Sequence, residues 1–334
     1  MAQRGSVHLS WAALAAAAIL AMPACVEVEA AAEGSFQRTV TVSGEPEIDV
    51  STGSGSIEVR PGTDGRVEIT GQIRAGEGWG FGSSLSAEER VRRIEAEPPI
   101  QQSGNLVRIG HIADDRLRRG VSISYVFRVP VGSRVKSRTG SGSQNIEGVS
   151  GPVDAESGSG SLTLTRLGGS ARGSTGSGSI EADDIGGALT VSTGSGSIRA
   201  GGVNGAIHAR TGSGGVDITQ TGQGDVDAQS GSGTVHLRGI RGGLRASTGS
   251  GGIHVDGELA GDWRLSASSG SIHVDLPPGQ GFELDATTGS GSIDVGPPIT
   301  TSGNVDRRHV QGTVGGGGPL LHVRTSSGGV QIRQ

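Results

Sequence analysis

Cysteine, aromatic residues and long apolar runs are scarce in this chain. Its 334 residues include one Cys, one Tyr, three Trp and four Phe. A single thiol excludes a framework of intramolecular disulfides. The net charge is −5, and the basic residues form no stripe interleaved with aromatic rings, so a nucleic acid is not expected as a partner.

Glycine, in contrast, is abundant and regularly placed. The chain has 63 glycines, and variants of the phrase small-Gly-Ser-Gly-small-aliphatic occur nine times between Gly142 and Gly291. The intervals between successive anchor glycines are 18, 18, 18, 18, 19, 18, 19 and 21 residues. A fixed period of this kind is typical of a protein built from stacked repeats.

Apolar residues alternate with polar ones on both sides of each glycine corner. Leu189-Thr-Val191 precedes one corner and Ile198-Arg-Ala200 follows it. This alternation predicts two strands of about five residues in each unit. Strands so short bury a core only if successive units stack on one another. The pattern therefore predicts an all-β fold, a single-stranded parallel β-solenoid similar to a β-helix, with coils of about 18 residues over residues 136–334.

Two other arrangements share this alternation. A soluble antiparallel meander closed into a barrel stays open as an alternative. A membrane-spanning barrel is disfavoured, because its strands need about 9–11 residues and its rims need girdles of aromatic residues. At the corners, we expect glycine to supply the positive φ of a tight turn and to let one corner sit directly on the next.

The N-terminal segment indicates export. Arg4 precedes a twelve-residue apolar run, residues 11–22, which is too short to cross a bilayer. We interpret residues 1–24 as a signal peptide and residues 25–35 as a tether.

Cys25 predicts a lipid anchor. It is the only cysteine, and it lies where a bacterial lipoprotein signal places its acylated residue. The alternative is ordinary signal cleavage, for instance after Ala32, which would leave no cysteine. Lipidation predicts an exported, membrane-anchored lipoprotein of the cell envelope, periplasmic or at the cell surface, that contacts the membrane through its lipid only.

Leading β-strands are expected over residues 36–135, with an insertion at residues 76–120. Within this insertion Ser86-Ala-Glu-Glu89 forms a capping box, which predicts a helix over about residues 87–97. The helix is expected either to cap the open end of the solenoid or to be a solvated excursion. At the other end of the chain, residues 320–333 are expected to form the last coil.

Outward positions after the glycine corner hold the most distinctive polar residues. His236, His254 and His273 occupy this position on three successive units, and Asp217 and Asp294 are expected to flank them. Imidazoles about 4.8 Å apart could swing together onto a metal ion, and protonated ones would repel. The alternative is that repeat duplication copied one surface histidine. A second outward column comprises Asp154, Arg172, Thr190, His208, Asp227 and Arg245.

The order of these segments resembles a known family. A signal sequence, the strand Tyr125-Val-Phe-Arg-Val-Pro130, the Thr-Gly-Ser-Gly coils and the closing Ser326-Ser-Gly-Gly-Val330 are similar to the bacterial putative-adhesin family of β-strand repeats, a domain family of unknown function. The resemblance covers residues 36–334. It implies an envelope-located, non-catalytic β-solenoid and supplies no active-site residues.

Two classes of function remain. A binding or structural scaffold, meeting an envelope partner, a polysaccharide or its own copies, is favoured because the repeats are regular and their acidic residues scattered. A carbohydrate-active β-helix enzyme is the alternative, and it would need a cleft of clustered Asp, Lys and Arg. A metal- or pH-responsive envelope protein using the histidine column is a further possibility. We predict no catalytic residue and no cofactor.

Overall fold

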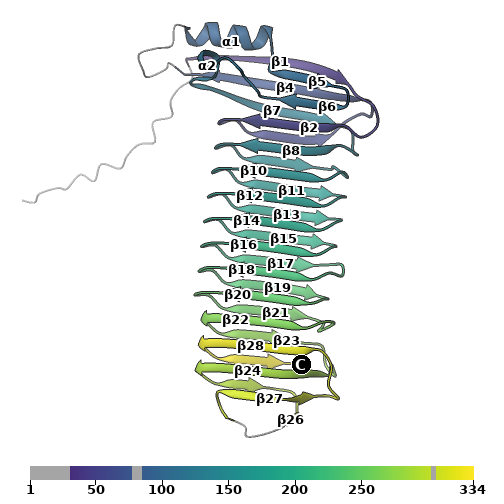
Figure 1. Cartoon of the computed structure of the whole chain (residues 1–334), viewed down its shortest axis with the longest axis vertical. Coiled ribbons are helices and arrows are strands. Elements are labelled where there is room, and N and C mark those ends of the chain that lie inside the picture. The colour runs from purple at the N-terminus through teal and green to yellow at the C-terminus, as the bar shows by residue number, and fades with distance from the viewer. Residues whose placement is uncertain (1–30, 77–84, 302–305) are drawn as a thin grey trace, which may run out of the picture.

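Two long sheets run side by side along one axis (Figure 1). The computed structural model describes residues 31–76, 85–301 and 306–334. Within these residues one sheet has 14 strands and the other has 15. Both sheets are open, with an edge strand at each end, which excludes the closed antiparallel alternative.

Each regular coil contributes one strand to each sheet. The 14-stranded sheet receives β9 (Gln144–Glu147), β11 (Leu162–Leu167), β13 (Ile180–Ile185), β15 (Ile198–Val203), β17 (Val216–Gln220), β19 (Val235–Ile240), β21 (Ile253–Gly257) and β23 (Ile272–Asp275). The 15-stranded sheet receives β8 (Arg134–Thr139), β10 (Val153–Ser157), β12 (Ala171–Thr175), β14 (Leu189–Thr193), β16 (Ile207–Thr211), β18 (Val226–Ser230), β20 (Leu244–Thr248) and β22 (Trp263–Ser269). Neighbouring strands are parallel and pair with the same position one coil on, as Leu189 does with Ile207. The prediction of stacked parallel coils is confirmed here.

The core is the narrow space between the two sheets. The inward positions predicted from the alternation are buried, with Leu189, Val191 and Ile198 each 1% exposed. A third aliphatic residue in most coils closes the core at the corner after the 14-stranded sheet; Ile185, Val203 and Ile240 are 0% exposed, and the β17 coil has the buried Gln220 at this position. Because most inward residues are Val, Ile, Leu and Ala, each coil covers the one beneath it; Trp263 of β22 is the one large ring among the inward residues of the regular coils.

A buried hydroxyl holds together each glycine corner from β8 to β20, and Ala267 occupies the same position in β22. The hydroxyl donates to a glycine carbonyl of the preceding coil at 2.7–3.1 Å and accepts from the glycine N–H three residues further on at 2.7–3.2 Å. The residues in this column are Thr139, Ser157, Thr175, Thr193, Thr211, Ser230 and Thr248. The hydroxyls satisfy backbone groups that would otherwise be buried without partners.

The corner glycines have a different role from the one expected. Gly176, Gly178, Gly194 and Gly196 do not have positive φ. They are glycine because a Cβ would overlap the backbone of the coil below; at Gly178 it would meet the Gly160 carbonyl oxygen. The left-handed residue lies instead just before the third aliphatic position.

The residues with that left-handed backbone are Arg166, Asp184, Gly202 and Gly239, with φ of 52°, 57°, 64° and 67°. The expectation of close stacking between corners was therefore right. The expectation of a positive φ was wrong for these regular corners, and it holds at Gly291 and Gly328, where φ is 155° and 156°.

At the N-terminal end the chain leaves the solenoid and returns. The coil of β2 (Glu47–Thr52) and β3 (Ile57–Pro61) pairs with β8 and β9, although about 70 residues separate them in sequence. The intervening segment adds β4 (Arg66–Ala75), β5 (Ile100–Ser103), β6 (Leu106–Ile109) and β7 (Val121–Val129), and β1 (Ala32–Thr41) forms the edge. The β1–β4 and β4–β7 pairs are antiparallel, so the sheets are mixed.

A helix covers this end. α1 (Ala87–Ala96) lies across β1 and β4, and the short α2 (Asp115–Arg118) lies beside it (Figure 1). The inner face of α1 buries Ala87, Val91 and Ile94. It also buries Arg90, whose guanidinium donates to the carbonyls of Ser86, Gly76 and Arg119. Of the two expectations for this helix, the end cap is the one that the structure shows.

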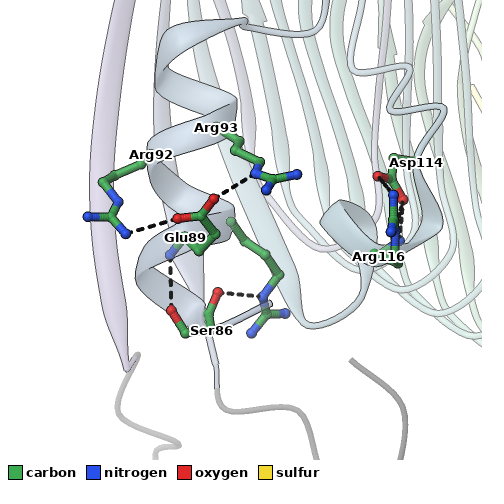
Figure 2. Close-up of polar contacts among 7 residues, drawn as sticks. Ser86, Glu89, Arg92, Arg93, Asp114 and Arg116 are labelled. Carbon is green, nitrogen blue, oxygen red and sulfur yellow. Dashed lines mark hydrogen bonds and ion pairs between the residues drawn. The ribbon is translucent and has the colours of Figure 1, made fainter. Parts of the chain in front are cut away.

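The exposed side of α1 carries ion pairs. Ser86 accepts the Glu89 N–H at 3.2 Å, and Glu89 lies between Arg92 and Arg93 at 2.9 and 2.8 Å (Figure 2). Hydrogen bonds from Arg93 and then Arg92 lower the pKa of the Glu89 carboxyl. These contacts are solvated, so the buried face of the helix contributes most of its stability.

At the C-terminal end the coils do not follow the order of the sequence. β28 (Leu320–Ser327) lies between β22 and β24 (Phe282–Ser290), and β29 (Val330–Arg333) lies between β23 and β25 (Ile293–Val295). The strands β26 (Ile299–Thr301) and β27 (His309–Val314) then finish the 15-stranded sheet in antiparallel pairing. The expectation that residues 320–333 form the last coil is wrong, because these strands insert between two earlier coils.

Candidate functional site: a histidine ladder on one face

The three predicted histidines form a ladder on the outer face of the 14-stranded sheet. His236 pairs in register with His254, and His254 with His273, because β19, β21 and β23 are parallel neighbours. Their rings stack with centroids 4.8 and 4.7 Å apart and with interplanar angles of 10° and 5°. All three side chains are half-buried. The ring spacing is that of the strands themselves, so the sheet fixes the ladder.

Stacking affects the protonation of the middle ring. Partial burial lowers the pKa of His254, and the neighbouring His273 and His236 lower it further, while Asp275 acts in the opposite direction. A charged imidazolium at this position would lose hydration and meet two further rings that also bind protons. The stack therefore favours the neutral form of His254.

The two flanking aspartates are placed differently. Asp217 pairs in register with His236, and its carboxylate binds Arg238 at 2.8 Å. Asp294 is not next to His273: Gln331 of the inserted β29 lies between them, since His273 pairs with Gln331 and Gln331 with Asp294. The expectation that Asp294 flanks the ladder is wrong for this reason.

The rings do not converge on a common point. They lie parallel, and within residues 31–76, 85–301 and 306–334 no group of three or more His, Cys, Asp or Glu is arranged to hold a metal ion. Two neighbouring rings would have to rotate toward each other to share an ion. Metal binding by His236, His254 and His273 stays a prediction.

The second predicted column lies on the outer face of the other sheet. Asp154 pairs with Arg172, and His208 with Asp227, at successive coils of the 15-stranded sheet. The His208 Nδ1 lies 3.3 Å from the Asp227 carboxylate, which Arg210 also approaches at 3.8 Å. The Oδ1 atom of Asp154 is buried and has no hydrogen-bond partner among the described residues.

Sequence reasoning missed one polar cluster. Asp285 lies 3.1 Å from the Nδ1 of His322 and 3.8 Å from the Nε2 of His309. The three residues come from β24, β28 and β27, which become neighbours only through the inserted C-terminal strands. No sequence signal could have found the cluster, because the repeat period breaks before these residues.

Cys25, the signal peptide and most of the tether lie outside the described residues. Among the helices that the structure describes, none is both long and apolar enough to cross a membrane.

The geometry defines the class of the protein as a β-solenoid of stacked parallel coils. Residues 174–333 match the family model described as Toastrack DUF4097. The resemblance to a putative-adhesin β-strand-repeat family of unknown function is thereby confirmed. No curated protein matches the chain.

Two solved structures are similar to the chain at low identity. One is a putative adhesin from Bacteroides fragilis, 13% identical, with a TM-score of 0.35 over 90% of this chain and 97% of that one. The other is a putative cell adhesion protein from Clostridium sporogenes, 11% identical, with a TM-score of 0.20 over 90% of this chain and 100% of that one.

Proposed function

We propose that this protein is a non-catalytic binding or structural scaffold of the bacterial cell envelope. The observation that carries the proposal is the contrast between the two sides of each strand. Most inward positions repeat Val, Ile, Leu or Ala from coil to coil, with Gly173 and Trp263 among the exceptions, while outward positions change among charged and polar residues. A scaffold that keeps its core and varies its faces is suited to presenting an extended binding surface.

An enzyme built on such a scaffold would place its catalytic groups where the coils are interrupted. From β8 to β23 the described coils follow one another without an inserted loop. The match to a family described only as Toastrack DUF4097 adds no catalytic residue. The regular faces thus favour binding over catalysis.

The attachment to the membrane is part of the same proposal. A lipid on Cys25, followed by the short tether, would hold the capped N-terminal end near the bilayer and leave the far coils free to meet a partner. We expect intact mass measurement of the protein made in a diderm bacterium to show a diacylglyceryl-sized increment and membrane retention, both lost in a Cys25→Ala variant. A soluble product that begins beyond Cys25 would contradict the anchor and leave the scaffold proposal standing.

A second candidate function is a metal- or pH-responsive face, which the stacked histidine ladder favours. To share one ion at about 2.0–2.1 Å, two of the three rings would turn out of their parallel stack until their nitrogens face each other. Titration with Zn²⁺, followed through the imidazole NMR signals, should shift those of His236, His254 and His273 together, and His254→Asn should weaken binding. Equal binding by the His254→Asn variant would reject the ladder as the site.

A further inference from the structure

The face opposite the ladder is hollowed along its length. A hollow of about 420 Å³ runs over β14 to β22, and one of about 470 Å³ runs over β2 to β14. Both are lined by Ala188 and Thr190, so they form one groove parallel to the solenoid axis. From Lys136 to Arg264 it spans seven strand spacings, about 34 Å.

Two rows of side chains border this groove. One row is the outward column from Lys136 to Arg264, and the other is made of the residues just before each strand. Both rows carry charge at the two ends of the groove, whereas its middle is lined by Ala188, Ala206 and Thr190. A ligand lying here would meet charged side chains at both ends of the groove and uncharged side chains between them.

Four of the five cations that line the groove make no ion pair within the described part of the chain, and the fifth, Arg264, lies 3.8 Å from the Asp262 carboxylate. The four are Arg134, Lys136, Arg172 and Arg245. Three of its carboxylates have donors: Asp225 accepts from the Gly243 N–H, Asp262 from the Leu320 N–H, and Asp227 from the Gln229 amide, with the His208 Nδ1 3.3 Å away. The groove therefore offers unpaired positive charge to a ligand.

Besides Glu47, whose carboxylate makes no ion pair or hydrogen bond among the described residues, the unoccupied carboxylate of the groove is that of Asp154. It stands in register between Lys136 and Arg172, and its buried Oδ1 has no partner among the residues that the structure describes. A buried acceptor without a donor is costly, so a ligand hydroxyl at this point would be bound favourably. Lys136, Asp154 and Arg172 thus present a cation, a hydrogen-bond acceptor and a second cation on three successive coils.

We propose that this groove binds a linear polysaccharide that bears carboxylates, a polyuronate. Such a polymer has an extended shape, repeated carboxylates for Lys136 and Arg172, and hydroxyls for Asp154 and Thr190. The inference rests on the scaffold function proposed above and names the partner of one of its faces.

Lys136 makes the proposal directly testable, because it is the only lysine in the chain. The exported full-length protein is incubated with polygalacturonate oligomers and a carbodiimide, which joins a bound carboxylate to a nearby amine as an amide. Peptide mapping should find the sugar adduct on the peptide that contains Lys136. A Lys136→Arg variant should still bind and give no such adduct. An adduct elsewhere only, or none, would overturn the proposal.

Affinity measurements are the second test of the proposed polyuronate groove. Arg172→Gln and Arg245→Gln should each weaken polygalacturonate binding about five- to tenfold, since each removes a charge-assisted contact. Arg199→Gln, at the matching outward position of the opposite sheet, is the control and should bind as the parent does. Equal loss in that control, tighter binding of polyphosphate, or equal binding of neutral dextran would overturn the assignment.

A last comparison separates this inference from the scaffold function. If envelope material still binds the whole protein but neither Arg172→Gln nor Arg245→Gln affects it, the polyuronate groove is wrong and the binding scaffold survives. If envelope material does not bind at all, the scaffold's binding role fails as well. Concentration-dependent pairing of the chain that Arg172→Gln abolishes would show instead that a second copy occupies the groove, and would also overturn the proposal.

Discussion

At the scale of single residues, Tyr125 places a hydroxyl without a partner in the core of the described residues. Tyr125 is 1% exposed and packs between Phe36 and Phe127, with ring centroids 6.3 and 5.7 Å away. Its hydroxyl is buried, and it neither donates nor accepts a hydrogen bond within the described residues. Burial also raises the pKa of this phenol far above its ordinary range. The ring stabilises the N-terminal end, whereas the hydroxyl does not.

We therefore expect Tyr125→Phe to leave the free energy of unfolding unchanged or raise it by about 1 kcal/mol, because it removes an unsatisfied hydroxyl. Tyr125→Ala should cost about 3–5 kcal/mol, because it leaves a cavity among aromatic rings. Urea unfolding of both variants measures the difference. A clear loss of stability in Tyr125→Phe would show that the hydroxyl has a partner in solution.

The histidine ladder makes stability depend on pH. The folded pKa of His254 lies below its ordinary value of 6.5, so the unfolded chain binds more protons in the interval between the two. Stability is then complete above about pH 6.5 and falls as the pH drops toward the folded pKa. Arg238 on β19, Asp275 on β23 and Asp256 on its own strand are the other charged groups on this face near the ring.

Urea midpoints at pH 7.5 and 5.5 should therefore differ more in the parent protein than in His254→Gln. His111→Gln, an exposed histidine outside the ladder, is the matched control and should keep the parent's pH dependence. The same pH dependence in His254→Gln and the parent would mean that the ladder does not titrate differently on folding.

At the scale of the element, the corner combines a buried hydroxyl with glycines that lack room for a side chain. Thr193 is 6% exposed and bonds both the Gly178 carbonyl and the Gly196 N–H, at 2.8 and 3.1 Å. The hydroxyl links one coil to the next, so its loss affects two coils. The glycine is limited by the carbonyl of the coil beneath it, not by φ.

Thr193→Val keeps the shape of the side chain and removes both hydrogen bonds, so we expect a loss of about 1–3 kcal/mol. Gly178→Ala should cost a similar amount, about 1–3 kcal/mol, because neighbouring coils must move apart. Ser177→Ala, at an exposed position of a corner, is the control and should change stability by about 0.5 kcal/mol or less. Thermal or urea unfolding measures all three, and an unchanged Thr193→Val would reject the structural role of the hydroxyl column.

These corners also mark the limit of sequence reasoning. The strands follow from the alternation of residues such as Ile198 and Ala200, because period two assigns each side chain to a face. The same rule correctly placed His236, His254 and His273 in one column. It did not reveal the bonds of Thr193, because a threonine beside a glycine is equally compatible with an exposed turn. It also missed the wall of the groove, since residues before a strand have no fixed side in the pattern.

At the scale of the whole molecule, the order in which the C-terminal coils stack is the feature that the sequence did not predict. Leu321 pairs with Trp263 on one side and Leu284 on the other, and Val330 pairs with Ile272 and Ile293. In a strictly sequential solenoid, Leu284 would pair with Trp263 directly. Both orders bury the same kinds of inward residue, so the hydrophobic pattern does not distinguish them.

The inserted order predicts how the C-terminal end responds to truncation. Deleting residues 320–334 removes β28 and β29, which are the only described strands that join β24 and β25 to the preceding coils. We expect the deletion to expose β24 and β27 as well, so that hydrogen exchange of their amides becomes fast while β10 to β18 stay protected. In a sequential solenoid, the same deletion would remove one terminal coil and leave β24 protected. Hydrogen exchange followed by mass spectrometry of the full-length and truncated proteins distinguishes the two outcomes, and continued protection of β24 would show that it can dock on β22 without the inserted strands.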